Sequence, residues 1–126
     1  MHTLSTSARP NIQSAATLSG YRVRNEQSQD LGTIEELMID PDSGRVVYAV
    51  LSFGGFWGFG DKLFAIPWSL LALNSQERIF VLHVDREVLE RAPAFNYEDW
   101  PDFTDKQWGT EIHNHYGRMP ASSFPV

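Results

Sequence analysis

The sequence contains no cysteine, no basic cluster and no apolar run of the roughly 20 residues that span a bilayer. The missing cysteines exclude disulfides, thiolate chemistry and every cysteine-based zinc site. Because phosphate contacts dominate nucleic-acid affinity, a net charge of −6 without a basic patch argues against nucleic-acid binding. The same acidity disfavours docking on anionic lipid, so no membrane insertion is expected.

The first residues also lack a charged region followed by an apolar stretch, which a secretory signal peptide needs. Residues 1–17 are rich in Ser, Thr and Ala and show no apolar periodicity, which predicts a flexible arm. We therefore expect a cytoplasmic protein whose ordered part begins at about residue 18.

The composition that is present is globular. Hydrophobic residues make up 42% of the 126 residues, with 8 Phe, 4 Trp and 4 Tyr. A chain of this size and composition is long enough to bury one core.

Alternating apolar and polar residues predict a strand over 21–24, and short apolar runs bounded by turn residues predict strands over 45–53, 63–68 and 79–84. Residues 31–39 are ambiguous, because Ile34 and Leu37 fit helical spacing whereas a β-bulge near Glu35 and Glu36 would allow a strand. The strand is favoured, since the Pro- and Gly-containing turn at 40–44 leads directly into the next strand. Strand 45–53 is apolar on both faces, so we expect it to be the most buried.

The second half of the chain changes character. We expect a short helical turn over 70–73, a short helix that starts after Asp85, and an aromatic, acidic segment over 94–103. Thr104 with Gln107 resembles a capping box. The helix that follows places three apolar residues on one stripe suited to docking: Trp108, Ile112 and Tyr116.

About five short strands followed by one or two helices predict a mainly β protein, a small β-barrel with short C-terminal helices. We divide the chain into the arm at 1–17, a barrel at 18–91, an aromatic segment and helix packed on the barrel at 92–116, and a flexible tail at 117–126.

Four stretches in this order resemble the PRC-barrel domain, the barrel shared by the photosynthetic reaction-centre H subunit and the ribosome-maturation factor RimM. They are LGTIEELMID at 31–40, the DPDSG turn at 40–44, VYAVLSFGG at 47–55 and LFAIPW at 63–68. The resemblance covers residues 18–91, and the segment after it is similar to stand-alone bacterial PRC-barrel proteins. It implies an all-β barrel used as a docking module, with no catalytic residues to carry over.

The glycine-rich stretch from Gly54 to Gly60 contains Phe56, Trp57 and Phe59. It lacks the Gly-Lys-Ser/Thr ending and the following helix start of a phosphate-binding loop. We interpret it as a hairpin whose rings either fold over the barrel mouth or, if exposed, form an interface. Homodimers are the commonest oligomers, so a second copy of the chain is the expected partner, with another protein as the alternative.

Other constellations favour structural roles. His113 and His115 are two residues apart on a helix, not the four of a zinc motif, so we expect no metal and no cofactor. Asp40, Asp42 and Gly44 resemble a calcium loop, but Leu51 stands where a bidentate Glu belongs. The acidic residues between 98 and 105 are interpreted as caps and solvated surface.

Two functional hypotheses follow. The first is a non-catalytic interaction module that self-associates through hairpin 54–60, with Phe56, Trp57, Phe59, Trp108, Ile112 and Tyr116 as its partner-binding residues. The second is a small-ligand-binding barrel or an unrecognised enzyme, because a small barrel can hold a ligand in its mouth. No Ser or Thr has a base suggested by the sequence, so we expect no catalytic residues.

Overall fold

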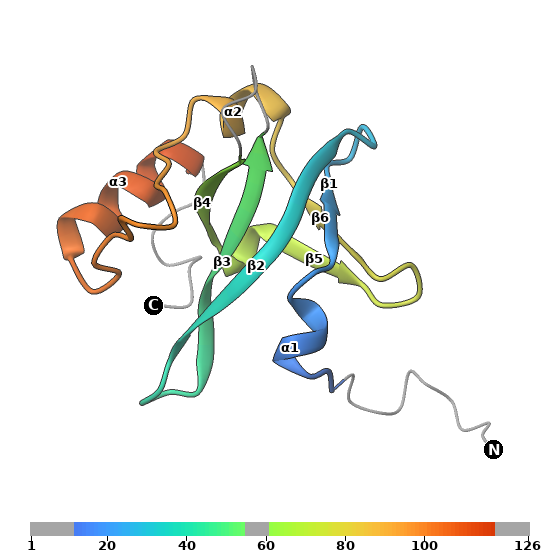
Figure 1. The fold of residues 1–126 in the computed structure, drawn as a ribbon, viewed down its shortest axis with the longest axis horizontal. Coiled ribbons are helices and arrows are strands. Elements are labelled where there is room, and N and C mark those ends of the chain that lie inside the picture. Colours follow the sequence, from blue (N-terminus) through green and yellow to red (C-terminus); the bar gives the residue numbers. More distant parts are fainter. Residues whose placement is uncertain (1–11, 55–60, 118–126) are drawn as a thin grey trace.

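The computed structural model describes residues 12–54 and 61–117. Six strands form one sheet in the order β4-β3-β2-β1-β6-β5, and the sheet curls into a half-barrel (Figure 1). Strands β1 and β6 run parallel, whereas all other neighbours run antiparallel. The strands are β1 (Arg22–Arg24), β2 (Asp30–Asp40), β3 (Arg45–Gly54), β4 (Asp61–Pro67), β5 (Leu71–Asn74) and β6 (Ile79–Leu82). The predicted mainly β barrel class is confirmed.

Strand β2 is irregular at the places where its apolar spacing looked helical. Its pairing with β3 shifts register between Ile34 and Glu36, which confirms the predicted bulge. Its pairing with β1 shifts at Leu31, so Leu31 and Ile34 are both buried although they are three residues apart. The bulges therefore convert a helix-like spacing into a strand that faces the core.

Strand β3 forms the centre of the packing. Residues 48–53 are buried without interruption, as expected for the strand that is apolar on both faces. Across the interior, the Phe80 ring contacts those of Tyr21 and Trp68, with centroids 6.0 and 5.7 Å apart. Burial of such aromatic and aliphatic surface is the main stabilising contribution to the domain.

Two segments differ from expectation. The helical turn predicted over 70–73 is wrong, because a 3₁₀ turn, η3 (Trp68–Leu70), is followed by strand β5, which pairs with β6. In the described part of the expected arm, Ser14 caps a one-turn helix, α1 (Ala15–Leu18). The Ser14 hydroxyl accepts a hydrogen bond from Ala16 N at 3.1 Å, which satisfies one of the free donors at the helix start.

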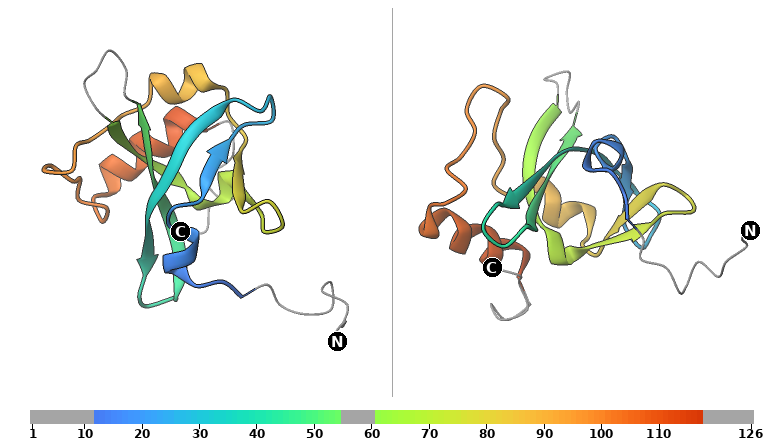
Figure 2. Two further views of the ribbon diagram at one scale, coloured as in Figure 1. Left: turned by 45° about the vertical axis from the view of Figure 1, so that its right-hand side comes forward. Right: turned by 90° about the horizontal axis from the view of Figure 1, so that it is seen from below.

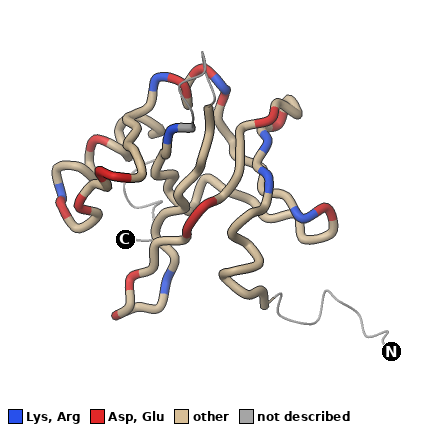
Figure 3. Tube along the Cα trace, viewed as in Figure 1, with Lys and Arg blue, Asp and Glu red and all other residues tan. Residues whose placement is uncertain are grey.

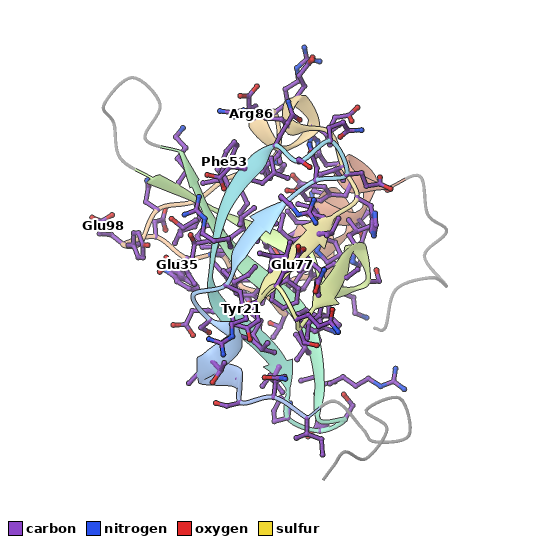
Figure 4. All side chains as sticks on the ribbon, turned by 90° about the vertical axis from the view of Figure 1, so that its right-hand side faces the viewer. Tyr21, Glu35, Phe53, Glu77, Arg86 and Glu98 are labelled. Carbon is purple, nitrogen blue, oxygen red and sulfur yellow. The ribbon has the colours of Figure 1, made fainter. Side chains whose placement is uncertain are left out.

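Two further helices follow the sheet. Helix α2 (Arg86–Glu90) lies near the end of β3, where the Arg86 guanidinium sits over the Phe53 ring at 5.1 Å (Figure 4). Helix α3 (Lys106–Tyr116) lies beside the sheet, and the segment between the two helices pairs with β4 at Phe95 and then loops outward (Figure 2). Among residues 12–54 and 61–117 no helix is long and apolar enough to cross a bilayer.

Candidate interaction groove

Five aromatic rings join the sheet to the C-terminal segment (residues 93–116), and Phe103 lies at their centre. Its ring centroid is 4.9 Å from Trp108, 5.8 Å from Tyr48 and 6.2 Å from both Phe95 and Trp100. The rings are inclined to one another, as the quadrupoles of aromatic pairs favour. This aromatic cluster therefore connects β3, the loop before α3 and α3 itself.

The start of α3 is held by local hydrogen bonds. The Asp105 carboxylate accepts a bond from Gln107 N at 2.9 Å, so the N-cap is Asp105, one residue after the predicted Thr104. Thr104 instead donates from its hydroxyl to Asp102, at 2.6 Å, and from its backbone N–H at 2.9 Å. These bonds favour the ionised form and lower the pKa of the Asp102 carboxyl.

The other end of α3 is held by burial and by one long-range hydrogen bond. Ile112 and Tyr116 are buried in the common core, with Ile112 only 1% exposed. His115 Nε2 lies 2.7 Å from the carbonyl oxygen of Val88, to which it donates its proton, because a carbonyl can only accept. Helix α3 is thereby fixed to the sheet and to α2.

Between α3 and the β2–β3 hairpin lies a groove of about 780 Å³. Ile39 is 51% exposed at the hairpin side of this groove. The hairpin supplies Met38, Ile39, Asp40, Pro41, Val47 and Tyr48, and the C-terminal segment supplies Phe103, Thr104, Asp105, Lys106, Gly109, Thr110 and His113.

The inner part of the groove is uncharged at neutral pH. The rings of Tyr48 and His113 are stacked, with centroids 6.0 Å apart and an interplanar angle of 20°. Burial lowers the pKa of His113 and raises that of Tyr48, so both side chains are neutral near pH 7. Charge is confined to Asp40, Asp105 and Lys106, so both signs lie on one apolar surface.

The structure separates the residues that the sequence assigned to a partner surface. Trp108 is partly buried within the aromatic cluster. The structure corrects the prediction for Ile112 and Tyr116. Their apolar stripe packs α3 against the barrel of the same chain, so it is not available to a partner. Burial of this surface within the chain is what holds the helix in place. Phe56, Trp57 and Phe59 lie outside the described residues.

The sequence did not reveal the hairpin side of the groove. Ile39 and Val47 lie close to the turn at residues 40–44, and the apolar pattern of strand 45–53 predicts burial, not an exposed surface. An apolar residue beside a polar turn was the available signal. This signal indicates a groove only when α3 is known to lie opposite the hairpin.

Metal ligation finds no support in the described part of the chain, where no three His, Cys, Asp or Glu side chains converge. The calcium-like pattern at residues 40–44 is a turn, as predicted. Asp40 accepts from Asp42 N at 2.9 Å through its carboxylate and from Gly44 N at 2.8 Å through its carbonyl.

Comparisons with known proteins show what this chain is similar to. A search of curated protein sequences finds no match. Among solved structures, the chain is similar to a Pseudomonas aeruginosa protein described as the 16S ribosomal RNA processing protein RimM, with 17% identity and a TM-score of 0.42 over 67% of this chain. The chain spans half the length of that protein. The PRC-barrel domain profile matches residues 10–89, and this chain therefore belongs to the PRC-barrel domain family.

Proposed function

We propose that this chain is a non-catalytic protein-interaction module and that its partner is a second copy of itself. The observation that carries the proposal is the open apolar groove between α3 and the β2–β3 hairpin, with Ile39 half exposed beside it. Exposed apolar surface of this kind marks an interaction site on a soluble domain.

A second copy suits the charges of the groove. In a twofold interface the same patch meets itself, so a favourable patch carries both signs. Lys106 of one copy would face Asp40 or Asp105 of the other, around a neutral centre formed by Tyr48 and His113. This neutral centre adds no like-charge contact between two chains that each carry a net charge of −6.

A second contact is proposed at residues 54–60, which join β3 to β4. Phe56, Trp57 and Phe59 supply the aromatic residue types that anchor interfaces. The groove borders the opposite end of β3, so the two surfaces can be tested separately.

The test is sedimentation equilibrium over a concentration series. We expect the wild type to dimerise, and Ile39→Asp to weaken the dimer at least about tenfold by placing a charge in an apolar contact. Ile12→Asp is the matched control, since Ile12 is 85% exposed and does not line the groove. A wild type that stays monomeric at all concentrations would refute self-association. Dissociation only in a Phe56, Trp57 and Phe59 triple alanine variant would move the interface to residues 54–60.

A small-ligand role is the second candidate, because the groove volume falls within the roughly 300–1,000 Å³ of small-molecule pockets. Side chains such as Leu51 and Phe80 are buried in the barrel interior, whereas the groove is open to solvent. A thermal-shift screen separates the two functions, because a ligand at 100 times its Kd adds about 2.7 kcal/mol of stability. A metabolite that stabilises the wild type and not Ile39→Asp would favour this second function.

A further inference from the structure

A second cavity, of about 270 Å³, lies between the C-terminal segment and Ala65 of β4 and shares no residue with the groove. Three aromatic residues line it, Phe95, Trp100 and Trp108, together with the carboxylate-bearing Asp99. We propose that this aromatic cavity binds the quaternary ammonium group of a small molecule.

The aromatic walls are set at angles to one another. The rings of Phe95 and Trp100 have centroids 5.2 Å apart and planes inclined by 60°, so they form a corner. Trp108 reaches the cavity from α3, and its ring is held by Phe103 at 4.9 Å. The negative faces of aromatic rings attract cations, and several inclined rings around one space suit a tetrahedral ammonium group with methyl substituents.

Asp99 is the charged residue of the lining, and no Lys or Arg accompanies it. Its position is set by a tight turn in which Asp99 N donates to the carbonyl of Asn96 at 3.1 Å. Among residues 12–54 and 61–117, no hydrogen bond or ion pair engages the Asp99 carboxylate. It is therefore available to a ligand, and its charge selects a cation over a neutral group of the same shape.

The surroundings strengthen this selection. Between residues 95 and 105 the chain carries four acidic residues and no basic one, and acidic positions gather along this loop in Figure 3. Such a single-sign field raises the local concentration of cations. The cavity volume is roughly nine times that of a water molecule in the liquid, which leaves room for a trimethylammonium group.

The cavity does not follow from the family. All of its lining residues except Ala65 lie beyond residues 10–89, which match the PRC-barrel domain. The aromatic segment looped out in Figure 2 builds the site against the edge of the barrel, where Leu63 and Phe95 exchange two hydrogen bonds of 2.9 Å. A ligand in the aromatic cavity would thus be a property of this chain and its C-terminal segment.

The experiment titrates the full chain with choline and, in parallel, with 3,3-dimethylbutan-1-ol, its uncharged carbon analogue, at constant ionic strength. Binding is followed by the indole N–H signals in ¹H–¹⁵N spectra, with the Trp100 signal assigned from Trp100→Phe. We expect choline to bind at least about tenfold more tightly than the alcohol and to shift the Trp100 and Trp108 signals. Equal affinities, no binding of choline, or shifts confined to other indoles would overturn the proposal.

Three variants at exposed positions, one of them a control, locate the site without threatening the fold. Asp99→Asn removes the charge and keeps the shape, so choline affinity should fall about fivefold while the alcohol is unaffected. Glu98→Gln is its matched control, because it removes the same charge one residue away, at the outer edge of the molecule in Figure 4 and outside the cavity lining. Trp100→Ala should weaken choline about tenfold. Equal losses of choline affinity in Asp99→Asn and Glu98→Gln would mean that only the overall negative charge of the segment matters. The proposed site would then be rejected.

Discussion

The curled sheet and the C-terminal segment, residues 93–116, are stabilised in different ways. The sheet relies on backbone ladders and on closely packed buried side chains, as in the six buried residues of β3. The C-terminal segment relies on ring contacts around Phe103, on the Asp105 cap and on the buried side chains of α3. The sheet therefore has little freedom at its backbone, whereas the segment depends on a few large side chains.

The two regions also differ in the candidate functional surface that they contribute. Tyr97 and Trp100, two of the large hydrophobic side chains that remain exposed, belong to the C-terminal segment. Both cavities discussed above use residues of this segment as one wall and the barrel as the other. The PRC-type barrel acts as a scaffold, and the segment added to it creates the surfaces that are open to a partner or ligand.

The largest expected effect comes from Gly32→Ala in β2. Gly32 has φ of +106°, and a Cβ there would lie 2.0 Å from the carbonyl oxygen of Ser52, a backbone atom that cannot rotate away. We expect a loss of about 3 kcal/mol in the free energy of unfolding, from backbone strain and overpacking together. Urea denaturation measures it. Wild-type stability would show that the sheet tolerates backbone changes after all.

Phe103→Ala tests the C-terminal segment. Removing the central ring of the aromatic cluster should cost about 2 kcal/mol, because Phe103 is only partly buried. Hydrogen exchange should show the loss in α3, with amide protection in β2 and β3 retained. An equal loss of protection in both regions would mean that the two fold as one unit and would remove the distinction.

Gly109→Ala is the same type of substitution in the C-terminal segment, and we expect it to stabilise the protein instead of destabilising it. Gly109 lies within α3, and a Cβ there would meet the Tyr48 hydroxyl at 3.5 Å, an ordinary contact. Because alanine favours the helix over glycine by nearly 1 kcal/mol, we expect a stabilisation of about that size. Thermal melting beside Gly32→Ala gives the comparison directly. A destabilised Gly109→Ala would show that the groove side of α3 is packed as tightly as the sheet.

The smallest effect concerns pH and His113. Burial lowers the pKa of His113 in the folded state, so the unfolded chain binds a proton more readily. The stability that neutral His113 contributes is therefore fully present above the unfolded pKa near 6.5. It is lost as the pH falls through that value toward the lower folded pKa. Melting curves at pH 7.5 and 5 should show a slightly larger loss for wild type than for His113→Gln. An identical loss would place His113 in a solvated position.

Much of the sheet could be predicted, because the apolar spacing along a strand and the residues of its turns indicate how it is buried. The bulge near Glu35, the turn at residues 40–44 and the burial of β3 all follow from apolar spacing and turn residues, and all are confirmed. Strand β5 could not be predicted, because its four residues have no alternation of their own and become a strand through pairing with β6. The cap of α3 was misplaced by one residue, since Thr104 and Asp105 are both good N-caps and local geometry chooses between them.

What the sequence by itself determined is the family, the curled sheet and the absence of cysteine chemistry, because these depend on residue types and on spacing along the chain. The tertiary structure decided which aromatic and apolar side chains are exposed to solvent. Ile112 and Tyr116 were expected at a partner surface and lie in the core, whereas Ile39 borders the groove. Exposure depends on what packs opposite a side chain, and a pattern along one strand or helix does not contain that information.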